Sequence, residues 1–258
     1  MIIMPQESLI VEPVRVLSDN YVWMVASGKN QYAAVDPGSA GEVILWLEGR
    51  KATLSHILLT HNHADHTGGV AALRKKYRTK VIGSHEDAHR LPPLDQKVKD
   101  GDCITLGDYS ATVLSTPGHT IGHVVYFLGD ALFPGDTLFS MGCGRLFEGT
   151  AEMMLQSLRK IMALDDKTRI YPAHEYTLTN HGFALSLEPD NPDLLSIQEE
   201  LMEKNSADQP TLPTTLGLEK KLNPFLRSDE AKLVKSLGLE KKNSTERFAT
   251  IREMRNRY

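Results

Sequence analysis

Four potential metal ligands lie within six residues of one another, at His61, His63, Asp65 and His66. Imidazole nitrogen and carboxylate oxygen are ligands that zinc, iron and manganese accept, and one loop carrying four of them can serve two metal ions. A single histidine is more often a surface residue than a ligand. Three of the chain's ten histidines share this segment with an aspartate, however, and the spacing therefore predicts a metal site.

Three later segments place a histidine or an aspartate directly after a short apolar run, and they end in His119, Asp136 and His174. Ligand sites in α/β proteins form outside the carboxyl ends of strands, so we expect these loops to converge with the histidine cluster in one cleft. Asp36 ends another such run. Both a turn residue and a carboxylate that orients a ligand histidine would explain it.

The elements that would position these residues follow from hydrophobic periodicity. Up to residue 172, short apolar runs rich in β-branched residues alternate with Gly, Pro and Asp, and a few stretches show the three- and four-residue spacing of helices. We expect strands at residues 11–17, 21–26, 32–35, 55–59, 81–83, 111–115, 124–128 and 169–171, and helices at 41–50, 69–77 and 152–163. This pattern predicts a mixed α/β domain.

The character of the sequence changes after Tyr176, where apolar alternation fades and prolines mark irregular segments. We therefore expect two domains, at residues 1–176 and 177–258. Helices are expected in the second at 181–187, 192–205, 228–237 and 244–256. Residues 217–258 contain eleven Lys or Arg against six Asp or Glu, on a chain of net charge −4. An anionic partner and a solvated helical surface would both explain this basic excess.

The composition is that of a soluble globular protein, with 41% hydrophobic and 24% charged residues among 258. No apolar run reaches the roughly 18 residues of a membrane span. Residues 1–11 lack the basic region and apolar stretch of a secretory signal, so we expect a cytoplasmic protein with no membrane partner. Cys103 and Cys143 are expected to be free thiols, because two cysteines forty residues apart form neither a disulfide framework nor a zinc-finger spacing. A monomer is the default expectation.

The order Thr-His-x-His-x-Asp-His, followed by single His, Asp and His residues, resembles the binuclear site of the metallo-β-lactamase superfamily over residues 11–176. The resemblance implies an αββα four-layer sandwich with a C-terminal helical domain. It also implies two divalent metal ions, with zinc expected and iron or manganese as alternatives. The ligands carried over are His61, His63 and His119 for one ion, Asp65, His66 and His174 for the other, and Asp136 as a bridge. Asp136, Asp65 and His66 are the expected catalytic residues.

Five further segments are similar to the hydroxyacylglutathione hydrolases, the glyoxalase II family. They are residues 17–23, 142–150, 174–177, 223–227 and 252–256. The glutathione-binding positions of that family correspond here to Arg145, Phe147, Tyr176, Arg252 and Arg255. Two of them depart from the usual pattern. Arg255 replaces Lys, which keeps the charge, and Phe147 replaces Tyr, which removes a hydrogen bond worth about 0.5–1.5 kcal/mol.

This resemblance implies hydrolysis of S-D-lactoylglutathione to glutathione and D-lactate, the second step of methylglyoxal detoxification, by hydroxide formed between two metal ions. The thiolate leaving group needs no strong general acid, because its conjugate acid has a pKa of about 8.5. No nucleic-acid partner is expected.

Other functions remain open at this point. A glutathione persulfide dioxygenase of the same fold would work with one iron and need fewer ligands. A metal-dependent nuclease would use the basic tail on RNA, although that tail has few aromatic residues for stacking. Cys143 as a nucleophile, and a non-catalytic binding protein, are less favoured because all seven ligand positions are filled.

Overall fold

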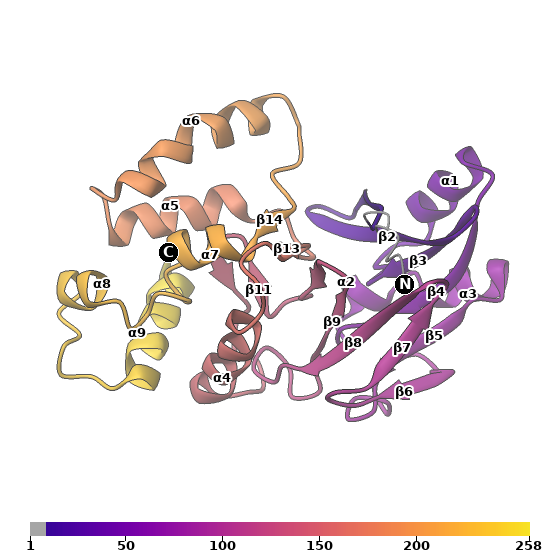
Figure 1. The fold of residues 1–258 in the computed structure, drawn as a ribbon, viewed down its shortest axis with the longest axis horizontal. Coiled ribbons are helices and arrows are strands. Elements are labelled where there is room, and N and C mark those ends of the chain that lie inside the picture. Colours follow the sequence, from indigo (N-terminus) through magenta and orange to yellow (C-terminus); the bar gives the residue numbers. More distant parts are fainter. Residues whose placement is uncertain (1–8) are drawn as a thin grey trace, which may run out of the picture.

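Two six-stranded sheets face each other in the computed structural model, which describes residues 9–258. Figure 1 shows them in one half of the molecule, with most of the C-terminal helices in the other. The first sheet has the order β1 (Val11–Val16), β2 (Asn20–Gly28), β3 (Gln31–Val35), β4 (Thr53–Leu58), β5 (Lys80–Ser84), β6 (Gln96–Val98). The second has the order β14 (Thr214–Thr215), β13 (Arg169–Ile170), β10 (Ala131–Phe133), β9 (Val124–Leu128), β8 (Tyr109–Ser115), β7 (Cys103–Leu106).

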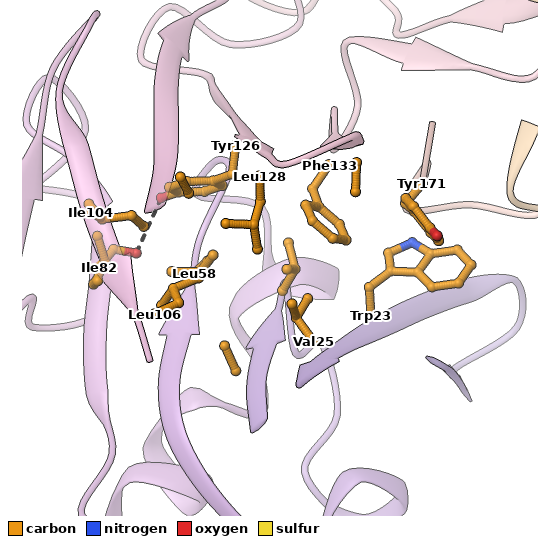
Figure 2. Close-up of a cluster of buried hydrophobic side chains, with 14 of the residues drawn as sticks. Trp23, Val25, Leu58, Ile82, Ile104, Leu106, Tyr126, Leu128, Phe133 and Tyr171 are labelled. Atoms are coloured by element: carbon orange, nitrogen blue, oxygen red, sulfur yellow. Dashed lines mark hydrogen bonds between the residues drawn. The ribbon is translucent and has the colours of Figure 1, made fainter. Parts of the chain in front are cut away.

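The central strands are apolar on both faces, because each sheet is covered on both sides. Successive side chains of a strand point to opposite faces. In β2, Trp23 and Val25 point into the core between the sheets, whereas Val22 and Met24 point to the outer side. Figure 2 shows this central core, where Trp23 packs edge-on against Tyr171, the residue after β13 of the second sheet, with ring centres 4.9 Å apart. The two sheets therefore form the middle layers of a sandwich.

Helices complete the outer layers. On the first sheet, α1 (Gly41–Gly49) and α3 (Val70–Tyr77) bury apolar side chains such as Leu47 and Leu73 against β2, β4 and β5. On the second, α4 (Ala151–Met162) buries Leu158 and Ile161 against the outer face of β9 and β10. The predicted αββα sandwich is confirmed.

The C-terminal residues form five helices, and the last of them lies beside α4 (Figure 1). They are α5 (Thr177–Leu187), α6 (Pro192–Ser206), α7 (Leu216–Leu222), α8 (Ala231–Ser236) and α9 (Ser244–Arg257). Phe183, Phe225 and Phe248 share one buried cluster with the apolar face of α4, and β14 pairs with β13. The helical region is therefore confirmed, whereas its division from the sandwich at residue 176 stays a prediction.

All eight expected strands and all seven expected helices are present, with shifts at their ends. The prediction of a helix beginning at residue 181 was wrong, because α5 begins at Thr177. Asn180, directly before the expected start, lies inside this helix, and its side-chain amide donates to the carbonyl of Ser140. β10 is the short apolar run that precedes Asp136. The prediction did not include α7 or the short elements β6, β7, β11 (Leu138–Phe139), β12 (Gly142–Cys143), β14 and α2 (Ala64–Thr67), most of which are too short for a periodic signal.

Candidate metal centre

The histidine cluster lies on the loop that follows β4. Leu58 ends this buried strand, and α2 begins after His63, so a single helical turn presents Asp65 and His66 one after the other. His61 and His66 are completely buried, although their ring nitrogens are polar. Buried polar groups are found where a partner or a metal ion satisfies them, so the loop is built for ligation.

The other three predicted ligands come from the ends of strands in the second sheet. His119 follows β8, Asp136 follows β10, and His174 follows β13. A backbone bridge between His174 and Asn20 joins the end of β13 to the start of β2. Gly135 adopts a φ of +47°, and a Cβ there would lie 2.3 Å from the Thr60 hydroxyl, so only glycine lets the Asp136 loop approach the histidine loop. In the structure these loops converge with the histidine cluster, as the sequence predicted.

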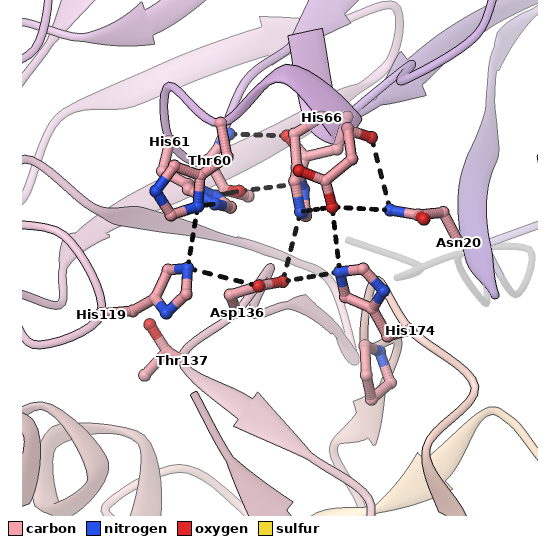
Figure 3. Close-up of polar contacts among 12 residues, drawn as sticks. Asn20, Thr60, His61, His66, His119, Asp136, Thr137 and His174 are labelled. Atoms are coloured by element: carbon pink, nitrogen blue, oxygen red, sulfur yellow. Dashed lines mark hydrogen bonds and ion pairs between the residues drawn. The ribbon is translucent and has the colours of Figure 1, made fainter. Parts of the chain in front are cut away.

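Six of the seven side chains form two clusters of three, and Figure 3 shows this region in close-up. In the first, His63 Nδ1 lies 3.0 Å from His61 Nε2 and 3.1 Å from His119 Nε2. In the second, Asp65 Oδ2 lies 3.4 Å from His66 Nε2 and 3.5 Å from His174 Nε2. Within each cluster the potential ligand atoms lie within 4.8 Å of one another, as three ligands around one cation require.

Asp136 lies between the two clusters. Its Oδ2 is 3.3 Å from His119 Nε2, while its Oδ1 is 3.4 Å from the Nε2 atoms of both His66 and His174. One carboxylate oxygen therefore faces each cluster. This is the geometry that a bridging ligand needs.

The nitrogen and oxygen atoms of these side chains fit divalent cations, and two of them have no hydrogen-bond partner within residues 9–258. Among the described residues, His66 Nε2 and Asp136 Oδ1 are buried and accept or donate no hydrogen bond. Three imidazole nitrogens that converge on one point cannot all be satisfied by hydrogen bonding to each other, because each neutral ring has one donor and one acceptor. Asp36, His61 and His66 form a third set of potential metal ligands. Both carboxylate oxygens of Asp36 already accept hydrogen bonds, however, so this set is a weaker candidate for a metal site.

The pKa shifts differ among the ligands. Burial, more than any neighbour, holds the pKa of His61 and His119 below the usual value, so these imidazoles are neutral, as ligation requires. Burial acts to raise the pKa of Asp136, but His66, His174 and His61 outweigh it and hold that pKa well below the usual value. Asp136 is therefore an anion, which suits a site for two cations.

Burial acts to lower the pKa of His66 and His174, but their contacts with Asp136 above all outweigh it and hold both pKa values above the usual value. The hydrogen bond to His66, above all, lowers the pKa of Asp65, which is therefore an anion.

Three of the ligand rings are oriented through their second nitrogen. His66 Nδ1 lies 3.0 Å from Asp36 Oδ2, and His174 Nδ1 lies 2.7 Å from Asp19 Oδ1. The Nδ1 of His119 lies 2.8 Å from the carbonyl oxygen of Arg145. Such partners fix the tautomer of a ligand histidine and raise its basicity.

Sequence reasoning left Asp36 unassigned and missed the role of Asp19. For Asp36 the sequence did carry a signal, because this aspartate directly follows an apolar run and precedes Pro37 and Gly38. In the structure it lies in a sharp turn with a φ of +52°. Asp19 carried no comparable signal, since nothing in the sequence connects it to His174, 155 residues away. His123, also unassigned, is fully buried, and its Nε2 accepts a hydrogen bond from the backbone N–H of Asp136 at 3.2 Å.

A cavity of about 480 Å³ opens over the metal centre and is lined by all five predicted substrate residues. Tyr176 stacks on His174 with ring centres 4.7 Å apart, and Phe147, 63% exposed, lies edge-on to His119 at 5.2 Å. Arg145 is exposed at the rim. Arg255 is half-buried and donates to the Asn180 side-chain oxygen at 3.2 Å.

Arg252 differs from the other four because it is only 5% exposed. Its Nη1 donates to the carbonyl oxygen of Cys143 at 2.6 Å, and its guanidinium lies 5.0 Å from the ring centre of Phe225. Most of this side chain is therefore part of the protein interior.

Cys143, the alternative candidate nucleophile, is also buried. Burial raises the pKa of its thiol, which makes it a poor nucleophile.

Two sequence families match the chain without overlap. Residues 16–174 match the metallo-beta-lactamase superfamily, and residues 175–258 match the hydroxyacylglutathione hydrolase C-terminus. A protein of Photobacterium profundum named hydroxyacylglutathione hydrolase is 46% identical over 194 residues, which are 75% of this chain and 76% of that protein. The chain belongs to the hydroxyacylglutathione hydrolase family. Its sandwich places it, with that family, in the metallo-β-lactamase superfamily.

Solved structures agree with this placement of the hydroxyacylglutathione hydrolase fold. The crystal structure of ETHE1 from Myxococcus xanthus superimposes with a TM-score of 0.69 at 26% identity, over 95% of this chain and 90% of that one. A protein called TTHA1623, solved in a di-iron-bound form, superimposes with a TM-score of 0.62 at 25% identity, over 84% of this chain and 100% of that one. The fold, together with its His and Asp clusters, indicates a binuclear metal site in this chain.

Three simpler predictions can also be compared with the structure. Cys103 and Cys143 are free thiols, as expected. Among the described residues, no helix is both long enough and apolar enough to span a bilayer. The expectation drawn from residues 1–11 falls mainly on residues 1–8, which lie outside the part of the chain that the structure describes.

Proposed function

We propose that the chain hydrolyses S-(2-hydroxyacyl)glutathione thioesters, such as S-D-lactoylglutathione, to glutathione and the free 2-hydroxy acid. The observation that carries this proposal is the placement of Asp136 between two ligand clusters at the floor of a cavity that also contains Arg145 and Arg255. The name shared by the family's curated relatives supports thioester hydrolysis over the persulfide dioxygenase and nuclease alternatives.

The ligands in this proposal are those that geometry groups together. One cation would be held by His61, His63 and His119, the other by Asp65, His66 and His174, with Asp136 shared between them. Divalent cations bound there supply what the side chains lack, since they make water acidic enough to give hydroxide near neutral pH and they polarise a carbonyl. We propose zinc for both positions, with iron and manganese as alternatives that the same ligands accept.

The residues around the cavity suit a glutathione thioester. Glutathione carries two carboxylates, and the guanidinium groups of Arg145 and Arg255 line the cavity into which it would extend. Burial, assisted by the charges of Asp19, Asp136 and Asp65, raises the pKa of Tyr176, so its phenol keeps its proton and can donate to the substrate. Arg252 also lines the cavity, and we propose that it binds substrate as well, because its bond to the Cys143 carbonyl uses Nη1 and leaves other guanidinium N–H groups.

The departing thiolate needs no proton donor, because its pKa is low enough for it to leave as an anion. Among the described residues, the cavity lining offers no serine, and its one cysteine is buried with a raised pKa. The chain's own contribution is therefore to hold the ligands, keep Asp136 ionised and fix the thioester over the centre.

The proposal is tested by following the loss of S-D-lactoylglutathione absorbance with the purified protein, while bound metal is quantified. We expect hydrolysis that is abolished by a chelator, restored by zinc, and associated with two metal ions per chain. A metal-loaded protein that leaves the thioester intact would contradict the proposal. Oxygen uptake with glutathione persulfide, or cleavage of RNA, would then identify which alternative applies.

The remaining features of the proposal concern the protein's setting. We propose a monomer that acts on a small molecule, without nucleic acid or membrane as partner. A cytoplasmic location is part of the proposal, because glutathione is abundant there and keeps thiols such as Cys103 reduced. Gel filtration of the metal-loaded protein would test the monomer.

A further inference from the structure

The short hairpin formed by β11 and β12 connects the proposed metal ligand Asp136 to the substrate-cavity residue Arg145 along the chain. It begins two residues after Asp136 and ends directly before Gly144 and Arg145. A two-stranded hairpin of this size is not stable by itself in water. Met141, in its turn, has a φ of +53°, a conformation that side chains other than glycine adopt only when their surroundings impose it.

Side chains of the helical region supply that support. Five hydrogen bonds join the hairpin backbone to four side chains of residues 177–258. Glu219 accepts from Met141 N at 2.7 Å, and Asn223 donates to the carbonyls of Phe139 at 3.2 Å and Gly142 at 3.0 Å. Asn180 donates to Ser140, and Arg252 to Cys143.

Glu219 and Asn223 are the inner pair of this support. Both are fully buried, and Asn223 Nδ2 also donates to Glu219 Oε2 at 3.0 Å. The other partner of Glu219 is the Thr214 hydroxyl, at 2.9 Å. Burial raises the pKa of Glu219, and a buried carboxyl group with no cation among these contacts is an expensive way to stabilise a core. Neither residue lines the substrate cavity.

The hairpin is in close contact with a metal ligand. The carbonyl of Arg145 lies 2.8 Å from Nδ1 of His119 and so fixes the orientation of that ring. A Cβ on Gly144 would lie 2.0 Å from the Asp136 carbonyl and 3.0 Å from His119 Nδ1, so the segment has no free space in which to shift. A displaced hairpin would therefore move the partner of His119 and the guanidinium of Arg145 together.

We propose that Glu219 and Asn223 are positioning residues of the active centre, which hold the β11–β12 hairpin so that Arg145 orients His119 and faces the substrate. The metal and substrate roles of these residues rest on the proposed function. The pair acts through the backbone and touches neither the metal ions nor the thioester.

The test compares Glu219→Leu, which removes the acceptor of Met141 N, with Glu219→Gln, which keeps an oxygen there. Two readouts are used: the rate of zinc release from the loaded protein to a chromogenic chelator, and KM for S-D-lactoylglutathione. We expect Glu219→Leu to release zinc at least tenfold faster, in the range typical of lost ligand partners, and to show a raised KM. Glu219→Gln should stay within twofold of wild type in both.

Glu188→Leu is the matched control, because Glu188 is also a buried carboxylate of the helical region but bonds Arg227, away from the hairpin. It should lower the melting temperature and leave zinc release and KM within twofold. Where Glu219→Leu does not fold, Asn223→Ala is judged by the same criteria. The proposal is overturned if the folded variant matches wild type in both readouts, or if Glu188→Leu releases zinc equally fast. Zinc release decides the question even if the thioester is not a substrate.

Discussion

Asp36→Asn isolates the effect of a partner on a metal ligand, because the substitution hardly changes the shape of a side chain that is 3% exposed. Asp36 Oδ1 accepts from Thr60 N at 2.8 Å, and Oδ2 accepts from the Thr60 hydroxyl and faces His66 Nδ1 at 3.0 Å. An asparagine that keeps the bond to Thr60 N turns its NH₂ toward His66 Nδ1. This favours the tautomer in which Nδ1 accepts and Nε2 carries the proton.

A protonated Nε2 cannot ligate, so His66 must be forced back to the other tautomer at a cost in metal affinity. Loss of such a partner typically weakens metal binding about 10–100-fold, or roughly 1.4–2.7 kcal/mol. The folded state also loses one hydrogen bond to a charged group, about 1.5–3 kcal/mol. A domain stabilised by about 5–15 kcal/mol remains folded after that loss.

The assay is competition between the apo-protein and a zinc chelator of known affinity, with circular dichroism to confirm folding. We expect Asp36→Asn to bind one zinc ion as wild type does and the other 10–100-fold more weakly. Glu188→Gln, a buried carboxylate paired with Arg227 in the helical region, should bind both normally. Wild-type affinity for both ions in Asp36→Asn would refute the role given to Asp36.

Three further predictions follow from the same geometry. Asp136→Ala should reduce turnover of S-D-lactoylglutathione below about 1% of wild type by removing the shared anion, since removing one catalytic component commonly costs 10²-fold or more; a nearly active variant would exclude a bridging role. Phe147→Tyr, at a site 63% exposed, should lower KM roughly two- to tenfold by adding one hydrogen bond, and an unchanged KM would show that its ring edge does not reach the substrate. Hydrogen bonds from Arg90, above all, lower the pKa of Glu148 to about 2 from 4.5, so its stabilisation is complete above about pH 4.5 and is lost as pH falls toward 2. In urea unfolding from pH 5 to 2.5, the stability difference between wild type and Glu148→Gln should shrink, whereas a constant difference would contradict the assignment.

Much of the centre was predictable because its signals are local. The spacing of His61, His63, Asp65 and His66 records one loop after one strand, and α2 is a single turn, so sequence neighbours are also spatial neighbours. The segments that deliver the remaining ligands were recognisable from short apolar runs, such as the fully buried β10 before Asp136. The layer order of the sandwich followed from the family resemblance and was confirmed.

The same reasoning could not find contacts that join distant segments. The hydrogen bond between Asp19 and His174 spans 155 positions, and the one from Arg252 to Cys143 spans 109. Glu219 lies in α7, which was not predicted, and a buried glutamate in a basic segment looks like any surface residue in the sequence. Short strands such as β11 and β12 give no periodic signal, since two residues cannot show a period of two.

The sequence by itself therefore determined the predicted metal ligands and their loops, because four of the ligands are neighbours in the sequence and each of the other three follows a short apolar run. Only the tertiary structure decided that Asp136 faces both clusters, that Asp36 and Asp19 orient His66 and His174, and that Arg252 supports a hairpin. These roles depend on how the two sheets and the helical region pack, and packing brings together residues whose separation along the chain carries no information about their distance in space.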